Sequence, residues 1–153
     1  MALLIAGERS GVGKTTVTLS LLSYLSQQNY QVQSFKVGPD YIDPMFHTAV
    51  THRPCRNLDP ILTSQTYVKN CFARHSHGVH GVLVEGVMGL FDGIARPIQC
   101  RQKEQNINDR DPQLNDYGST AHIARLLQIP VLLVLDCSRL SSSIAAIVPV
   151  SYT

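Results

Sequence analysis

The chain has 153 residues, 44% of them hydrophobic and 16% charged, which predicts one globular domain with a sizeable core. A formal net charge of +2 is too small to favour nucleic acid or membrane partners, and no apolar stretch has the length of a membrane-spanning helix. Met1 leads directly into an apolar segment with no room for a signal peptide, and the four cysteines form no Cys-x-x-Cys pair. We therefore expect a cytoplasmic protein with reduced thiols.

Short apolar runs alternate with longer amphipathic segments along the chain. Strands are predicted over residues 3–7, 32–37, 81–85 and 129–136, and helices over residues 14–28, 64–74 and 119–127. The last two strands are nearly continuous apolar runs, as is typical of strands buried on both faces. The alternation predicts an α/β fold with a doubly wound, mostly parallel sheet, in which active sites lie beyond the carboxyl ends of the strands.

A glycine-rich segment lies between the first predicted strand and the first predicted helix. Glycines let backbone N–H groups turn toward an anion, and the helix that follows adds its unsatisfied N–H groups and the positive end of its dipole. In this P-loop pattern Lys14 reaches the β- and γ-phosphates and the Thr15 hydroxyl binds Mg²⁺, so ATP with Mg²⁺ is the expected ligand. The predicted nucleotide-binding residues are Ser10, Gly11, Val12, Gly13, Lys14, Thr15 and Thr16.

The spacing of this loop departs from the usual P-loop pattern. Glu8 occupies the position where the first glycine is expected, and Gly7 lies one residue earlier. With Arg9 ahead of Gly11 and Gly13, the loop resembles those of dethiobiotin-synthetase-like and partition-ATPase-like proteins, which implies a P-loop NTPase fold of that type. The alternative is a glycine turn that binds no ligand, and the Gly-Lys-Thr-Thr sequence in this context argues against it.

Carboxylates follow two of the predicted strands. Asp40 and Asp43 come after the strand at 32–37, and Glu85 ends the strand at 81–85. Because Mg²⁺ prefers carboxylate, hydroxyl, phosphate and water oxygens, these three residues and Thr15 are the predicted magnesium ligands. The two aspartates have an alternative role in turn formation. The corresponding alternative is weaker for Glu85, since a carboxylate at the end of a buried strand is costly without a metal or a paired charge.

Two segments do not follow the α/β alternation. Residues 96–116 are almost wholly polar, so we expect a surface loop there, and residues 138–148 begin a helix that Pro149 ends. We therefore expect residues 1–153 to form a single partial domain whose sheet is incomplete at the C-terminus. His75, His77 and His80 lie at and beyond a predicted helix end, where histidines are usually solvated, and this interpretation is favoured over a zinc site.

Several long motifs, in order, resemble the cobyrinic acid a,c-diamide synthase family. They begin with the P-loop and continue with Phe-Lys-Val-Gly-Pro-Asp-Tyr-Ile-Asp-Pro at residues 35–44 and Arg-Asn-Leu-Asp-Pro at residues 56–60. The most distinctive is Val-Glu-Gly-Val-Met-Gly-Leu-Phe-Asp-Gly at residues 84–93. Residues 118–121 and 135–139 also fit, so the resemblance covers nearly the whole chain except the polar segment and the last few residues.

The resemblance implies an ATP-dependent ligase of cobalamin biosynthesis that amidates the a and c acetate side chains of cobyrinic acid. In the family, ATP phosphorylates a substrate carboxylate, and ammonia from glutamine then displaces the phosphate. Catalytic roles are implied for Lys14, Asp40 and Asp92, the last in orienting substrate or ammonium. Lys36 is expected either to hold the acidic substrate or to be an exposed lysine at a strand end. The residues expected to shape the corrin side are Tyr41, Ile42, His47, Arg56 and Asn57, and Asp59 has the alternative role of capping the turn at Pro60.

Members of this family are much longer than this chain and carry a C-terminal glutaminase domain. The resemblance therefore implies a missing glutaminase domain or subunit and little or no synthetase activity from this chain alone, with a homodimer among the expected assemblies. Hydrogenobyrinic acid and a nickel sirohydrochlorin are alternative substrates. A partition-type ATPase switch is an alternative of another class, although it expects a lysine in place of Arg9 and gives no reason for the motifs at 38–41 and 91–93. A non-catalytic remnant is the third alternative.

Overall fold

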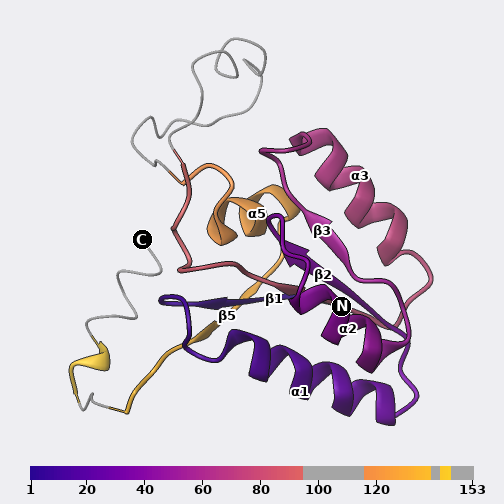
Figure 1. The fold of residues 1–153 in the computed structure, drawn as a ribbon, viewed down its shortest axis with the longest axis horizontal. Helices are drawn as coiled ribbons and strands as arrows, with labels where there is room; N and C mark the ends of the chain where they lie inside the picture. The colour runs from indigo at the N-terminus through magenta and orange to yellow at the C-terminus, as the bar shows by residue number, and fades with distance from the viewer. Residues whose placement is uncertain (95–115, 139–141, 146–153) are drawn as a thin grey trace.

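The computed structural model describes residues 1–94, 116–138 and 142–145. Its strands form one sheet in the order β3-β2-β4-β1-β5, and every neighbouring pair is parallel (Figure 1). The strands are β1 (Ala2–Gly7), β2 (Val32–Val37), β3 (Arg56–Leu58), β4 (Gly81–Glu85) and β5 (Val131–Val134). The helices are α1 (Lys14–Gln27), α2 (Asp43–Thr51), α3 (Gln65–Ser76) and α5 (Thr120–Leu127).

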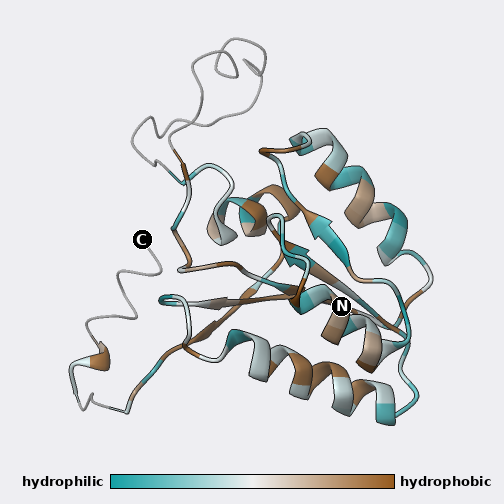
Figure 2. Ribbon diagram, in the orientation of Figure 1, coloured by the Kyte–Doolittle hydropathy of each residue, from teal (hydrophilic) through white to brown (hydrophobic). Residues whose placement is uncertain are grey.

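Helices cover both faces of the sheet, with α1 and α2 on one face and α3 and α5 on the other (Figure 1). Side chains of each strand alternate between the two layers: Leu4 and Ala6 of β1 pack with α3 and α5, whereas Ile5 packs with α1. Apolar residues gather in the strands and along the helices that cover them (Figure 2). This arrangement confirms the predicted doubly wound α/β fold.

Most predicted elements are present with nearly the predicted bounds. The strands predicted at 32–37 and 81–85 coincide with β2 and β4, and the three predicted helices correspond to α1, α3 and α5. The N-caps are Ser64 and Ser119, whose side chains accept hydrogen bonds from the first turns of α3 and α5. β5 is shorter than the predicted 129–136, because its partner β1 ends where Gly7 pairs with Val134.

Two elements were not predicted. The Asp-Pro sequence at the start of α2 favours a turn locally, but Pro44 occupies the first turn of the helix, where its missing N–H is not needed. β3 has only three residues and no apolar run, and it is a strand because residues 35–37 of β2 offer it an edge to pair with. The polar segment predicted at 96–116 and the helix predicted at 138–148 fall largely outside the described residues. In the described part of the chain, no helix is both long and apolar enough to cross a membrane.

The carboxyl ends of the parallel strands meet at one edge of the sheet, and the predicted motifs follow these ends. The P-loop follows β1, Asp40 follows β2, and Glu85 ends β4. The loop after β4 packs tightly here: a Cβ on Gly86 would lie 2.6 Å from the Thr120 Cγ2 atom and 3.0 Å from the Ile5 carbonyl oxygen. This close approach requires glycine and brings the loop after β4 beside the P-loop strand.

Candidate active site

The P-loop backbone adopts conformations that favour glycine at two positions. Gly11 has a φ of +80° and Gly13 a φ of +98°, and no atom lies within 4 Å of the Cβ that each lacks. Gly13 is also the N-cap of α1 and provides no side chain to cap the first N–H groups of that helix. These N–H groups and the positive end of the helix dipole therefore remain available to an anion, which fits a phosphate.

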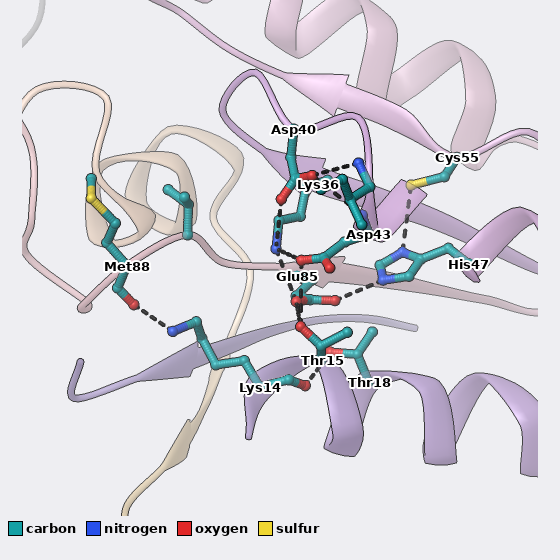
Figure 3. Close-up of polar contacts among 12 residues, drawn as sticks. Lys14, Thr15, Thr18, Lys36, Asp40, Asp43, His47, Cys55, Glu85 and Met88 are labelled. Carbon is teal, nitrogen blue, oxygen red and sulfur yellow. Dashed lines mark hydrogen bonds and ion pairs between the residues drawn. The ribbon is translucent and has the colours of Figure 1, made fainter. Parts of the chain in front are cut away.

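Lys14 begins α1 and is 7% exposed. Its Nζ donates hydrogen bonds to two carbonyl oxygens, that of Arg9 at 2.9 Å and that of Met88 at 2.6 Å. Figure 3 shows the bond to Met88. Burial, and after it the positive charge of Lys36, hold the pKa of Lys14 below its usual value. The Lys14 ammonium thus joins the P-loop to the loop after β4, and neither hydrogen-bond partner is an anion that neutralises it.

Glu8, at the position where a glycine is usual, ties the P-loop to the residues that follow β5. Its Oε1 accepts a hydrogen bond from the Asp136 backbone N–H at 3.3 Å and pairs with Arg9. The Arg9 guanidinium also lies 2.8 Å from the Asp136 carboxylate. A side chain at this position therefore connects the loop to the end of a neighbouring strand.

Strand alternation brings Lys36 and Glu85 together on one face of the sheet. The two residues are partners in the parallel pair of β2 and β4. Lys36 is four residues after Val32 in β2, and Glu85 is two residues after Leu83 in β4. Because residues at even spacing in a strand share a face, and Val32 and Leu83 pack on the side of α1 and α2, Lys36 and Glu85 point to that side as well. Lys36 is 3% exposed and Glu85 is 0% exposed. Two buried charges therefore meet near the carboxyl ends of two buried strands.

The Lys36 ammonium lies between three carboxylates, which together with it we call the Lys36 cluster (Figure 3). Its Nζ is 2.5 Å from Asp43 Oδ2, 2.9 Å from Glu85 Oε1 and 3.5 Å from Asp40 Oδ2. Burial by itself would lower the pKa of Lys36, but hydrogen bonds to Asp43 and Glu85 raise it above the usual lysine value. The ammonium offsets negative charge that could not be buried without a partner.

The Thr15 hydroxyl shares carboxylate oxygens with Lys36. Thr15 Oγ1 donates a hydrogen bond to Glu85 Oε1 at 2.6 Å and lies 3.4 Å from Asp43 Oδ2. One hydroxyl and two carboxylate oxygens around a positive charge are the donor chemistry that Mg²⁺ prefers, and the ammonium shows that a cation fits among them. No three His, Cys, Asp or Glu side chains in the described ranges are arranged to hold a metal ion. A Mg²⁺ ion here would therefore depend on Thr15 and on phosphate oxygens as well.

Glu85 is held on its other side by His47. The His47 Nε2 atom lies 2.6 Å from Glu85 Oε2, both side chains are 0% exposed, and Cys55 Sγ lies 3.5 Å from His47 Nδ1 (Figure 3). Burial by itself would lower the pKa of His47, but contacts with Cys55 and Glu85 raise it to about 9. Burial would raise the pKa of Glu85, but hydrogen bonds from His47 and Thr15 and the charge of Lys36 lower it to about 2. At neutral pH the pair is an imidazolium and a carboxylate.

Asp40 takes part both in a turn and in the Lys36 cluster. Its Oδ1 accepts hydrogen bonds from the backbone N–H groups of Ile42 at 2.8 Å and Asp43 at 3.2 Å, while Oδ2 faces Lys36. Burial would raise the pKa of Asp40, but the two backbone hydrogen bonds lower it below its usual value. Asn57 donates a hydrogen bond to the Asp40 carbonyl oxygen at 2.7 Å. The turn role and the charged role of Asp40 therefore coexist.

Asp92 lies outside the Lys36 cluster, in the loop after β4. Its Oδ2 accepts a hydrogen bond from the Gly89 N–H at 2.8 Å, which closes a turn. A Cβ on Gly89 would lie 2.8 Å from the Glu8 carbonyl oxygen, so this turn packs directly against the P-loop. Between described residues, no hydrogen bond or ion pair joins Asp92 to the cluster. The structure thus brings Asp40, Asp43 and Glu85 together around Lys36, joins Thr15 to them through Glu85, and leaves Asp92 on a neighbouring loop.

The residues expected to face a corrin are not all exposed. Tyr41 is 78% exposed and Ile42 is 68% exposed, next to Asp40, whereas His47 is fully buried against Glu85. Arg56 begins β3 but pairs with Phe35, one residue before Lys36, so it lies near the carboxyl edge of the sheet. Asp59 accepts hydrogen bonds from the N–H groups of residues 61 and 62, as expected for a cap of the turn at Pro60.

Sequence reasoning left Lys36 undecided and missed the buried role of His47. A signal existed for both. Lys36 lies between Phe35 and Val37, inside the strand predicted at 32–37 and not at its last residue, which favours a buried position over an exposed strand end. His47 is four residues after Asp43, a spacing that places both on one face of a helix, but the helix itself was not predicted.

A family model described as the CobQ/CobB/MinD/ParA nucleotide binding domain matches residues 3–150. Three relatives named cobyrinate a,c-diamide synthase are also similar to the chain. The relative from Synechocystis sp. is 60% identical over 97% of this chain, that from Synechococcus sp. 58% over 96%, and that from Gloeobacter violaceus 49% over 95%. Each alignment covers 28% of the relative, so the chain spans little more than a quarter of the length of these curated relatives.

Proposed function

The chain belongs to the CobQ/CobB/MinD/ParA nucleotide binding domain family, and from this premise we propose that it is the ATP-binding synthetase part of a ligase that amidates corrin carboxylates. The names of the relatives support cobyrinate as the substrate. The observation that carries the proposal is the meeting of the P-loop hydroxyl of Thr15 with the Lys36 cluster. Phosphoryl transfer from Mg–ATP requires a phosphate-binding loop next to oxygen ligands for Mg²⁺.

Different residues of this chain bind the phosphates, the Mg²⁺ ion and the substrate carboxylate. The P-loop N–H groups and Lys14 bind the phosphates, and Thr15, Asp43 and Glu85 hold Mg²⁺, with Asp40 beside them. When bound, Mg²⁺ supplies charge neutralisation of the phosphate oxygens. The Lys36 ammonium, released from the carboxylate oxygens that Mg²⁺ would take, would be free to hold a second anion, the substrate carboxylate, which phosphate would otherwise repel. Electrostatic stabilisation of this kind is often the largest contribution to catalysis.

The reaction proceeds in two displacements. A substrate carboxylate oxygen forms a bond to the γ-phosphorus of ATP while the bond to ADP breaks. Ammonia then attacks the acyl carbon of the acyl phosphate, and inorganic phosphate leaves with the proton that the nitrogen gives up. Asp92, on the loop beside the P-loop, orients the ammonia or the substrate. The ammonia comes from glutamine through a glutaminase domain or subunit. In the same proposal, the protein acts in the cytoplasm and forms a homodimer.

Isothermal calorimetry with Mg–ATP tests the nucleotide site. The wild-type chain is expected to bind, and Lys14→Ala is expected to lose binding, because its ammonium is the P-loop cation with no anionic hydrogen-bond partner. Lys69→Ala, which removes an exposed lysine of α3, is the matched control and should bind as the wild type does. Equal binding by wild type and Lys14→Ala would contradict the assignment of the loop.

A heavy-oxygen exchange experiment tests the chemistry separately. ATP labelled at the β–γ bridge oxygen should scramble its label only when a corrin acid accepts the phosphoryl group reversibly. Cobyrinic acid, hydrogenobyrinic acid and nickel sirohydrochlorin are offered in parallel to identify the substrate. Scrambling with one of the three would support the synthetase function, whereas its absence with all three, in a chain that binds Mg–ATP, would show that this chain transfers no phosphoryl group by itself, as expected for a partial domain.

A further inference from the structure

Both oxygens of the buried Glu85 carboxylate are occupied, and they have different partners. Oε1 contacts the Thr15 hydroxyl at 2.6 Å and the Lys36 ammonium at 2.9 Å, whereas Oε2 contacts His47 Nε2 at 2.6 Å. We propose that His47 is a positioning residue that fixes the Glu85 carboxylate with Oε1 toward Thr15 and thereby sets the affinity of the site for a nucleotide-bound divalent cation. This inference rests on the proposed binding of Mg–ATP.

The His47 ring is held at both nitrogen atoms. An ionised carboxylate only accepts hydrogen bonds, so the nitrogen that faces Glu85 must carry a proton. The other nitrogen, Nδ1, faces the Cys55 thiol at 3.5 Å. The Cys55 backbone is itself anchored to α2, because its N–H donates a hydrogen bond to Thr48 Oγ1 at 3.1 Å. The ring therefore cannot rotate without losing a partner on each side.

The position of His47 suits orientation and excludes direct contact with substrate. Its side chain is 0% exposed and lies between Glu85 and Cys55. It lies four residues after Asp43, so α2 presents one side chain to Lys36 and the other to Glu85 from the same helix face. Groups that bind a metal-ligating side chain from behind commonly change metal affinity by 10–100-fold when they are removed.

Four substitutions separate positioning from simple packing. His47→Leu keeps an apolar volume but leaves Glu85 Oε2 without a donor, whereas His47→Gln keeps an N–H donor at a similar reach. Cys55→Ala frees Nδ1 of the ring, and Cys55→Ser retains a hydroxyl that can fill the role of the thiol. The probe is Mn²⁺ with a non-hydrolysable ATP analogue, followed by electron paramagnetic resonance, and the metal-free analogue is titrated in parallel by calorimetry.

We expect His47→Leu to weaken Mn²⁺ binding by about tenfold or more. His47→Gln should recover most of that affinity, Cys55→Ala should show a smaller loss than His47→Leu, and Cys55→Ser should match the wild type. Affinity for the metal-free analogue should stay unchanged in every variant, because the P-loop is not altered. Unchanged Mn²⁺ affinity in His47→Leu, no recovery in His47→Gln, or an equal loss of metal-free binding would overturn the proposal.

A second measurement keeps the two proposals distinguishable. If the wild-type chain binds no nucleotide, the proposed function fails, and the orientation of Glu85 is then read from its carboxyl carbon signal by nuclear magnetic resonance. That signal should move in His47→Leu and return toward the wild-type position in His47→Gln. An identical Glu85 signal in the wild type and in whichever His47 variants remain folded would refute the positioning role independently of any ligand.

Discussion

Replacing Lys36 with Met tests whether its ammonium holds the carboxylates of the site together. Met retains an unbranched side chain of similar length, so β2 should keep its packing. The substitution removes a cation 2.5 Å from Asp43 and 2.9 Å from Glu85, and Glu85 is 0% exposed. Breaking a buried pair by removing one partner costs about 3–5 kcal/mol. Because the Asp43 side chain is 21% exposed and partly solvated, we expect a loss of unfolding free energy near the lower limit, about 3 kcal/mol.

Urea unfolding followed by circular dichroism, with and without Mg²⁺, measures this loss. A cation that binds only the folded state stabilises it by about 2.7 kcal/mol at a hundred times its dissociation constant. Mg²⁺ should therefore restore much of the stability of Lys36→Met, and it should stabilise the wild type less, because Lys36 competes for the same oxygens. Sodium chloride at equal ionic strength is the control for screening and should not restore the stability.

Lys69→Met is the matched variant for the change in net charge. Lys69 is exposed on α3, so its replacement should alter the unfolding free energy by no more than about 0.5 kcal/mol. If Lys36→Met loses less than about 1 kcal/mol, or if Mg²⁺ stabilises it no more than the wild type, the ammonium does not hold the carboxylates and the reasoning is refuted.

Three further predictions follow from the same contacts. The pKa of His47 is raised from 6.5 to about 9, so its stabilisation is complete below pH 6.5 and is lost as the pH rises toward 9. The pKa of Glu85 is lowered from 4.5 to about 2, so its stabilisation is present above pH 4.5 and is lost as the pH falls toward 2. Urea unfolding should show the greatest unfolding free energy between pH 4.5 and pH 6.5. A constant unfolding free energy from pH 6.5 to 9 would contradict the His47 contribution. Thr15→Val, which removes only the hydroxyl, should weaken Mg–ATP binding by about tenfold and leave metal-free ATP binding unchanged in calorimetry. Gly86→Ala should lower the unfolding free energy by about 1–3 kcal/mol, because its new Cβ would lie 2.6 Å from a threonine methyl group. Gly81→Ala, whose Cβ would meet nothing closer than 3.9 Å, should show no comparable loss in the same unfolding assay.

The parts of the site that were predicted depend on short stretches of sequence. The P-loop lies within a few residues, and its glycines, Lys14 and Thr15 have roles that follow from their order between a strand and a helix. Glu85 was assigned because a charge at the end of an apolar strand needs a partner, and Asp43 because it offers Mg²⁺ a carboxylate oxygen in the segment that follows a strand. The assignment of magnesium ligands remains a prediction, and so does the catalytic role of Asp92, which lies on a neighbouring loop.

The parts that were missed depend on contacts between distant segments. α2 was not predicted, because the Asp-Pro sequence at its start favours a turn when it is considered alone. Without that helix, the spacing of Asp43 and His47 had no meaning. β3 is too short for a recognisable pattern and exists because β2 has a free edge beside it.

By itself the sequence determined the alternating α/β architecture, the phosphate-binding loop and the presence of acidic residues at strand ends, since each follows from local periodicity or local chemistry. The tertiary structure alone decided which charges meet. β4 lies between β2 and β1 in the sheet, so Glu85 has Lys36 on one side and the P-loop strand on the other. Strand order depends on pairing between residues far apart in the chain, and local hydrophobic patterns do not specify it. That order turns separate lysine, histidine and acidic residues into one buried charged site.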